Sequence, residues 1–199
     1  MKRIFDIATV LFAFAIAANA QIGVIGGFTS SKTNVKDVDL KSMNLYHAGI
    51  AYKFEIGPVF CIQPSLAYQV KGVNLQDIQG TNDLQLKTGF VELGAGLQLG
   101  IDLAVIRPFA LVEPFIGYQV TGQEKWDNND TWGSIGNVTN KFEYGFGLGG
   151  GIELFDHVQI SAQWFKNLGA LSNAQGSDIP DTVKESNYQG IKFTLGLFF

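Results

Sequence analysis

A histidine within reach of a serine hydroxyl could activate that oxygen as a nucleophile, because a neutral imidazole can accept the hydroxyl proton. The sequence offers His47 as such a general base. The candidate nucleophiles are Ser42, Ser134 and Ser172, and their spacing from His47 singles out none of them. The competing interpretation is a plain interior histidine without a catalytic role, and we favour it over a catalytic pair.

Two other patterns could carry chemistry, and both are weak. Residues 145–150, Gly-Phe-Gly-Leu-Gly-Gly, match the dinucleotide fingerprint, which requires a helix to follow. Here an alternating strand pattern continues through Leu154 instead. Cys61 is the only cysteine, so neither an intramolecular disulfide nor a multi-cysteine metal site is available. We therefore predict no catalytic, cofactor-binding or metal-binding residues, no cofactor and no enzymatic activity.

The composition excludes several classes of protein. Of 199 residues, 46% are hydrophobic and only 16% are charged, and the formal net charge is −4. A disordered chain would be less apolar, and a nucleic-acid-binding protein would show a basic surface. After residue 20 no run of about 20 apolar residues occurs, so a helical membrane span is not expected.

The N-terminus has the pattern of a secretory signal peptide. Lys2 and Arg3 precede an apolar run from Ile4 to Ala17, and Ala18-Asn19-Ala20 offers a small-residue cleavage site. We predict that residues 1–20 are removed and that a single domain spans 21–199. The alternative is an uncleaved N-terminal membrane anchor.

The rest of the chain alternates between apolar and polar residues with a period of two, the pattern of β-strands with two unlike faces. The expected strands are 22–29, 46–54, 60–71, 84–100, 110–121, 142–154, 158–164 and 191–199. The facing of the first strand is unclear because it is rich in glycine. In the fourth strand the phase slips near Phe90 and Val91, which predicts a β-bulge.

Two of these segments resemble each other. IQPSLAYQVKG (62–72) and VEPFIGYQVTG (112–122) both carry proline in third place and end in Tyr-Gln-Val-x-Gly. Proline cannot donate a hydrogen bond to a neighbouring strand. We therefore predict a local break in strand pairing at Pro64 and at Pro114.

Long polar and short connections alternate between the eight segments, as in an antiparallel up-and-down β-barrel. The long connections are 30–43, 72–83, 122–140 and 169–187, and the short ones are 55–58, 102–107 and 155–157. The predicted fold class is therefore all-β, an eight-stranded antiparallel barrel.

The alternation alone does not decide whether the apolar face meets lipid or a core, and a soluble lipocalin-like carrier is the alternative. Two features favour a transmembrane barrel. The polar face is rich in glycine, which relieves crowding inside a narrow barrel, as at Gly145, Gly147, Gly149 and Gly151. Aromatic residues mark both ends of the apolar face: Tyr46, Tyr68, Tyr118 and Tyr144 near the long connections, and Phe54, Phe60 and Phe199 near the short ones.

The last segment ends in Phe199, with Leu197, Leu195 and Phe193 in step. This ending resembles the C-terminal signal that outer-membrane barrels present to their assembly machinery. With the signal peptide and the eight strands, it resembles the small OmpA/OmpX-type outer-membrane barrels, and the paired proline strands are similar to the PorT-like "porin family". The resemblance implies a place in the bacterial outer membrane, contact with its lipid, and the assembly machinery as a partner through the strand ending in Phe199.

The resemblance also implies a small integral surface protein, structural or binding an extracellular ligand or protein through its long connections. The loop 123–132, with Trp126 and Trp132, could form a recognition surface or cover the barrel mouth. A lipid-modifying outer-membrane enzyme dependent on His47 and a narrow channel remain alternatives. The inward charges are expected to pair and to close the lumen. They are Lys53, Glu92, Glu113, Glu143, Glu153 and Lys192.

Overall fold

The computed structural model describes residues 20–33, 40–78, 82–126, 133–134, 142–168 and 188–199. The predicted signal peptide lies almost entirely outside these residues and stays a prediction. The strands are β1 (Ala20–Thr33), β2 (Leu40–Ile56), β3 (Phe60–Ile78), β4 (Asn82–Gly100), β5 (Ile106–Trp126), β6 (Gly133–Ser134), β7 (Phe142–Leu154), β8 (Val158–Asn167) and β9 (Tyr188–Phe198).

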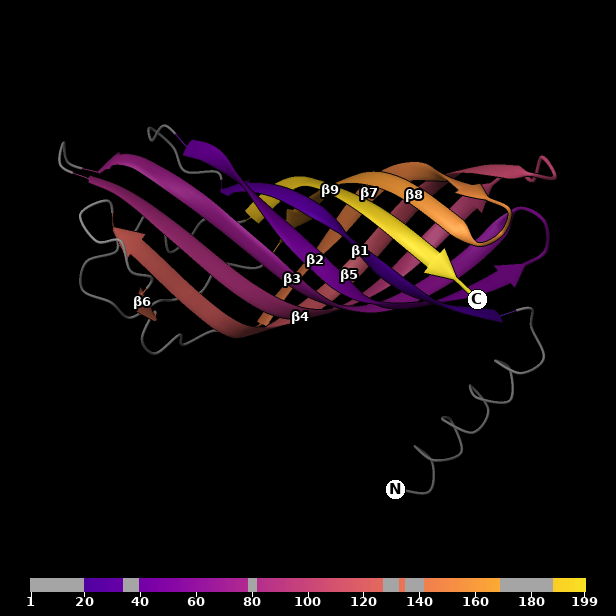
Figure 1. Ribbon diagram of the computed structural model, residues 1–199, viewed down its shortest axis with the longest axis horizontal. Coiled ribbons are helices and arrows are strands. Elements are labelled where there is room, and N and C mark those ends of the chain that lie inside the picture. Colours follow the sequence, from indigo (N-terminus) through magenta and orange to yellow (C-terminus); the bar gives the residue numbers. More distant parts are fainter. Residues whose placement is uncertain (1–19, 34–39, 79–81, 127–132, 135–141, 169–187) are drawn as a thin grey trace, which may run out of the picture.

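Eight long strands form a closed antiparallel up-and-down barrel, which confirms the predicted fold class. Each long strand pairs with the next one along the barrel wall, β1 pairs with β9, and the pairing of β4 with β5 closes the ring. The two-residue strand β6 is an addition at the edge of β5. The tight turns lie at the same end as the start of β1 and the end of β9 (Figure 1). No helix among the described residues is long and apolar enough to span a membrane.

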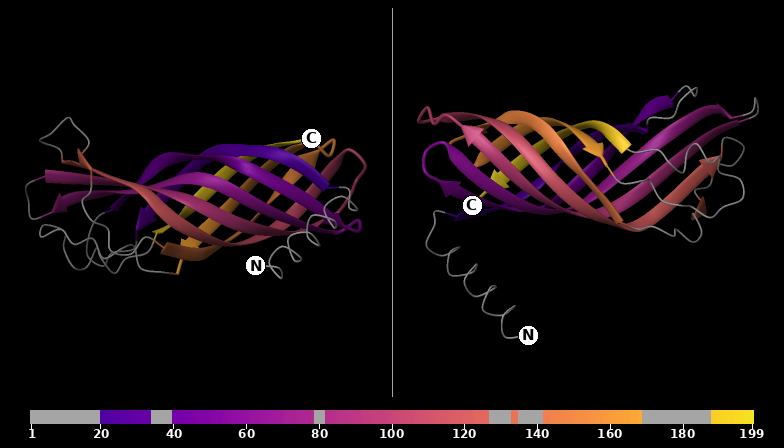
Figure 2. Two further views of the ribbon diagram at one scale, coloured as in Figure 1. Left: turned by 90° about the horizontal axis from the view of Figure 1, so that it is seen from below. Right: turned by 180° about the vertical axis from the view of Figure 1, so that it is seen from behind.

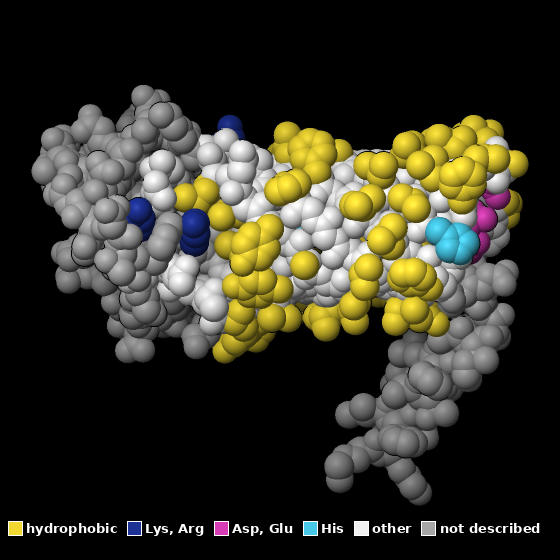
Figure 3. All heavy atoms as spheres, viewed as in Figure 1, with side chains coloured by type: hydrophobic (Ala, Val, Ile, Leu, Met, Phe, Trp, Pro, Cys, Tyr) yellow, Lys and Arg dark blue, Asp and Glu magenta, His cyan; other side chains and the backbone are white. Residues whose placement is uncertain are grey.

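The two faces of the wall are sorted opposite to those of a soluble protein. Outward side chains are apolar and exposed, as at Phe28 (71% exposed) and Ile116 (56%), whereas the inward Lys53, Lys71 and Gln98 are fully buried. Hydrophobic side chains cover the side of the barrel (Figure 3). Such a surface suits lipid and not water, which counts against the soluble carrier. The first strand follows the same rule, with Val24 outward and Thr29 inward.

The predicted aromatic positions face outward at both ends of the wall. At the end with the long connections, Tyr46 and Tyr68 are in contact, with ring centroids 6.5 Å apart, and Tyr118 lies 5.1 Å from Phe142. We call this ring of side chains the outer belt. The opposite end, with Phe54, Phe60 and the exposed Phe199, forms the inner belt.

All the long strands except β7 are longer than predicted. β3 and β4 extend through most of the expected connection 72–83, and β5 continues to Trp126. Polar pairs such as Asn74 with Gln85 carry the ladder onward. Beyond the outer belt the outward face no longer needs apolar side chains, so the sequence loses its apolar period while the backbone pairing continues and inward residues such as Leu86 stay buried. The expected connection 102–107 is also too long, because β5 begins at Ile106.

Both predicted proline breaks are confirmed, each on one side of its strand. Pro64 interrupts the pairing of β3 with β2, and Pro114 interrupts that of β5 with β4, without a change of register at either gap. Pairing on the other side of each proline is continuous. The flanking pairs are Ala51 with Ser65 and Phe54 with Ile62 at the first gap, and Gly94 with Phe115 and Leu97 with Val112 at the second.

The irregularity predicted near Phe90 and Val91 is present, but it lies in the neighbouring strand β5 and not in the fourth strand. The register between β4 and β5 shifts between Gly89 and Phe90. The extra residue belongs to β5, where Val120 lies between the partners Gln119 and Thr121. Phe90 keeps the inward phase of Thr88 and Glu92 and is buried.

Glycine keeps the wall of β7 close to its neighbours. A Cβ atom on Gly145 would overlap the carbonyl oxygen of Lys166 and lie 2.6 Å from the Phe115 ring. At Gly151 it would lie 2.7 Å from the ring of Phe109. β7 can therefore pack this closely against β8 and the inward phenylalanine rings only because Gly145 and Gly151 have no side chain.

We predict that Gly145→Ala lowers the free energy of unfolding by about 1 to 3 kcal/mol, as overpacking usually does. The matched control is Gly26→Ala, whose Cβ would lie 3.5 Å from the nearest described atom and fits without displacement. Urea unfolding in lipid vesicles, followed by tryptophan fluorescence, measures both. Equal stability of the two variants would contradict the crowding at β7.

Candidate functional site in the barrel lumen

Near the inner belt, the lumen is filled by an ion-pair cluster around Lys53. Its ammonium group contacts the Glu153 carboxylate and lies 2.8 Å from Glu55. On the other side of Glu153, Arg107 Nη1 lies 3.6 Å from Oε2 and donates a hydrogen bond to Gln98 over 3.1 Å. These groups come from β2, β7, β5 and β4, so the cluster joins opposite walls of the barrel.

The middle of the lumen contains a second pair. Lys192 Nζ lies 2.6 Å from the Glu113 carboxylate, which also accepts a 3.2 Å hydrogen bond from Gln163. The same ammonium is 3.9 Å from Glu92. Glu92 thereby links the Lys192–Glu113 pair to the cluster around Lys71, described next.

Closer to the outer belt, Lys71 is the centre of a third buried cluster. Its ammonium group donates hydrogen bonds to Glu92 (3.0 Å), Glu143 (2.8 Å) and Asn167 (3.3 Å). It also faces three aromatic rings, whose centroids lie 4.6 to 5.3 Å away. Cation–π attraction of this kind is strongest where water is excluded. The rings are those of Phe90, Phe115 and Phe165.

Glycines on neighbouring strands make room for the acidic side chains. Gly117 pairs with both Glu92 and Glu143, and a Cβ on it would lie 2.6 Å from the Glu143 carboxylate. Gly147 pairs with Glu113. Neighbouring strands are only about 5 Å apart and surround a narrow interior. A long inward side chain therefore fits where the paired residue on the next strand is a glycine.

His47 lies inside the lumen, as predicted, and is buried. Its Nδ1 lies 3.1 Å from the Thr29 hydroxyl and its Nε2 lies 3.1 Å from the Thr194 hydroxyl. Both ring nitrogens are therefore engaged by threonines. The structure does not bring Ser42 or Ser134 to it, since Ser42 is exposed on β2 and Ser134 lies in β6. Ser172 lies outside the described residues.

The space left between these groups is small. A cavity of about 20 Å³ lies among His47, Glu92, Glu113, Gln163 and Lys192. Such a volume holds about one water molecule. Within the described part of the chain, no group of histidine, cysteine and acidic residues could hold a metal ion.

Sequence reasoning identified much of this network but not its centre. All six predicted inward charges are buried and paired. It missed Lys71, Arg107 and Asn167. Lys71 is in the same inward phase as Gln69, and this phase could have identified it as an inward charge. Arg107 was missed because it falls in the expected connection 102–107.

The comparisons with known proteins agree with this architecture. A family model described as "Outer membrane protein beta-barrel domain" matches residues 14–173. No curated protein sequence matches the chain.

Among solved structures, the chain is similar to Neisserial surface protein A, at 13% identity, covering 91% of this chain and 99% of that one with a TM-score of 0.48. It is also similar to Ail, the attachment invasion locus protein of Yersinia pestis, solved with the heparin analogue sucrose octasulfate (12% identity, 90% and 99% coverage, TM-score 0.47). A third is OprG of Pseudomonas aeruginosa (10% identity, 92% and 97% coverage, TM-score 0.46).

We predict that Lys71→Met destabilises the barrel by about 3 to 5 kcal/mol, because it leaves the buried Glu143 carboxylate without a cation and Glu92 with only Lys192, 3.9 Å away. Adding Glu143→Gln should recover part of this loss, since one negative charge is then removed. Urea unfolding in lipid vesicles measures both variants. Lys166→Met, at an exposed lysine, is the control and should change stability by less than about 0.5 kcal/mol. Equal effects at positions 71 and 166 would show that the cluster does not stabilise the fold.

Proposed function

Because this chain belongs to the outer membrane protein beta-barrel domain family, which resides in the bacterial outer membrane, we propose that it is a small surface protein with a closed lumen that acts through its outward end. The proposal has three parts: the lumen does not conduct, the protein catalyses no reaction, and its outward connections make the contacts. We also propose that it belongs to the PorT-like subgroup. The proline strands β3 and β5 support that assignment.

The observation that carries the proposal is the filling of the lumen at three successive levels. The clusters of Lys53, Lys192 and Lys71 each reach across the interior, and every one of these ammonium groups is paired with carboxylate. An ion on its way through would have to separate buried pairs, which is costly. With about 20 Å³ of free space between the clusters, the barrel is better suited to a rigid support than to a pore.

The outward end offers the surface for contacts. β3, β4 and β5 continue past the outer belt as a paired sheet, and β6 adds to its edge at Gln123 and Glu124 (Figure 2). Loops on a rigid scaffold commonly carry recognition. The loop 127–132, which follows β5, and the connection 169–187, which follows β8, lie outside the described residues.

The absence of enzymatic activity is supported by the environment of His47. A base and a hydroxyl act on a substrate only if the substrate can reach them. His47 and Thr29 are buried, and the free space beside His47 holds about one water molecule, so a lipid substrate does not reach this pair.

Assembly through the last strand is supported by its position. β9 pairs with both β1 and β8, and the backbone N–H of Phe199 donates a 2.8 Å hydrogen bond to Ile22. The strand that an assembly machine would bind is therefore β9. Its pairing with β1 joins the last strand of the barrel to the first.

We expect the purified folded protein to produce no single-channel steps in planar lipid bilayers, because the buried pairs obstruct the lumen. A trimeric porin inserted by the same procedure is the positive control, and heat-modifiable migration on a gel verifies that the barrel is folded. Reproducible conductance steps from folded protein would contradict the closed lumen.

The surface role predicts that replacing residues 169–187 with a short glycine-serine linker abolishes attachment of cells to wells coated with extracellular matrix proteins, while the barrel still folds. The strain lacking the protein and His157→Ala, an exposed residue in a tight turn at the other end, are the controls. Equal attachment by all strains would contradict an adhesive role. Lipid A that differs between wild type and His47→Ala would instead favour the enzyme.

A further inference from the structure

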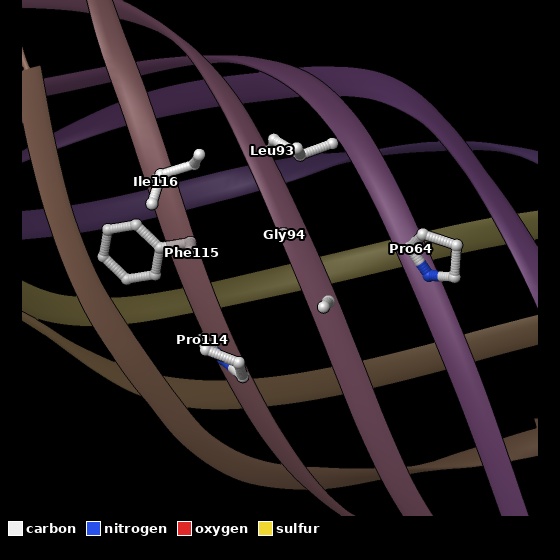
Figure 4. A pocket seen from close by; sticks show the side chains of 7 residues that line it. Pro64, Leu93, Gly94, Pro114, Phe115 and Ile116 are labelled. Carbon is white, nitrogen blue, oxygen red and sulfur yellow. The ribbon is translucent and has the colours of Figure 1, made fainter. Parts of the chain in front are cut away.

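A hollow interrupts the apolar outer wall of the barrel across β3, β4 and β5. Its volume is about 330 Å³. Its lining contains no charged or polar side chain, and Pro64 and Pro114 lie on either side of β4 (Figure 4). The lining residues are Pro64, Leu93, Gly94, Ala95, Pro114, Phe115 and Ile116.

The repeated proline segments build this hollow together. Pro64 pairs with Ala95, and the register places Pro114 opposite Ala95 from the other side. A methyl group thus lies between two rigid rings, and the outward side chains next to it on β4, Leu93 and Leu97, are much longer. The hollow exists because the smallest outward side chain of this part of β4 lies between the two prolines.

The depth of the hollow follows from the register of β4. Val91 is level with Tyr68 and Tyr118 of the outer belt, and Leu99 is level with Phe60 of the inner belt. Ala95 is midway between them. Four residues of a tilted strand correspond to a depth of roughly 10 Å, so the hollow lies near the middle of an apolar band about 25 Å tall.

We propose that the hollow is a binding site for the terminal part of a lipid acyl chain of the outer membrane. At this depth lipid head groups do not reach the wall, and the lining offers only dispersion contacts. The bilayer must fill the hollow, since an empty space would forfeit those contacts. A chain end inside it is contacted on several sides by rigid groups and exchanges more slowly than chains on the convex wall. This proposal rests on the membrane location and not on the proposed surface role.

The test fills the hollow and counts immobilised chains. Ala95→Phe and a smaller replacement, Ala95→Leu, place side chains in the hollow. Ala162→Phe, at an exposed outward alanine of β8, is the matched control. Each folded variant is reconstituted with phosphatidylcholine carrying a nitroxide near the chain end, and electron paramagnetic resonance gives the motionally restricted fraction per barrel.

We expect the motionally restricted fraction of the chain-end label to fall by about one chain per barrel in both Ala95 variants. In Ala162→Phe this fraction should not change. A nitroxide near the head group should report no difference between the variants, because the site is deep. Equal restricted fractions in wild type and both Ala95 variants would overturn the proposal. So would a detergent-solubilised dimer that Ala95→Phe converts to monomer, since the hollow would then belong to a second copy of the chain.

Discussion

A lysine ammonium group inside a membrane-embedded barrel is tolerated only when negative charge and hydrogen-bond acceptors surround it at close range. Lys71 satisfies this condition with two carboxylates, one amide and three aromatic rings. The rest of the interior depends on the same constraint. The acids need room, so their neighbours are glycines, and the glycines let the strands approach closely enough for an interior this narrow to be filled by side chains.

Alternation of residue types was sufficient to predict the strands, their two faces and the pairing of the inward charges. It could not predict the partners, because contacts across the lumen depend on the tilt and stagger of strands that are distant in sequence. Phe90, Phe115 and Phe165 illustrate the limit. An inward phenylalanine contradicts a simple division into polar and apolar faces, and its role became apparent only with Lys71 beside it.

The ends of the strands were the other weak point of the sequence analysis. Period-two alternation reports the membrane-facing part of a strand and not its full length, so the predicted strands ended too early while β3 and β5 continued past the outer belt. The prolines were more informative. Pro64 and Pro114 were predicted to cost pairing, and both do, yet their common neighbour Ala95 could be identified only from the register.

The ion pairs of the lumen join residues that are far apart along the chain. Lys53 and Glu153 are separated by 100 positions, and Lys71 and Glu143 by 72. The carboxylates of Glu113 and Glu143 meet their ammonium partners only when strands from both halves of the chain stand opposite each other. A partly formed sheet therefore carries exposed ammonium and carboxylate groups that require hydration. Closure of the ring and burial in lipid are thus coupled steps, and an incomplete barrel is held at the aqueous boundary by its own unpaired charges.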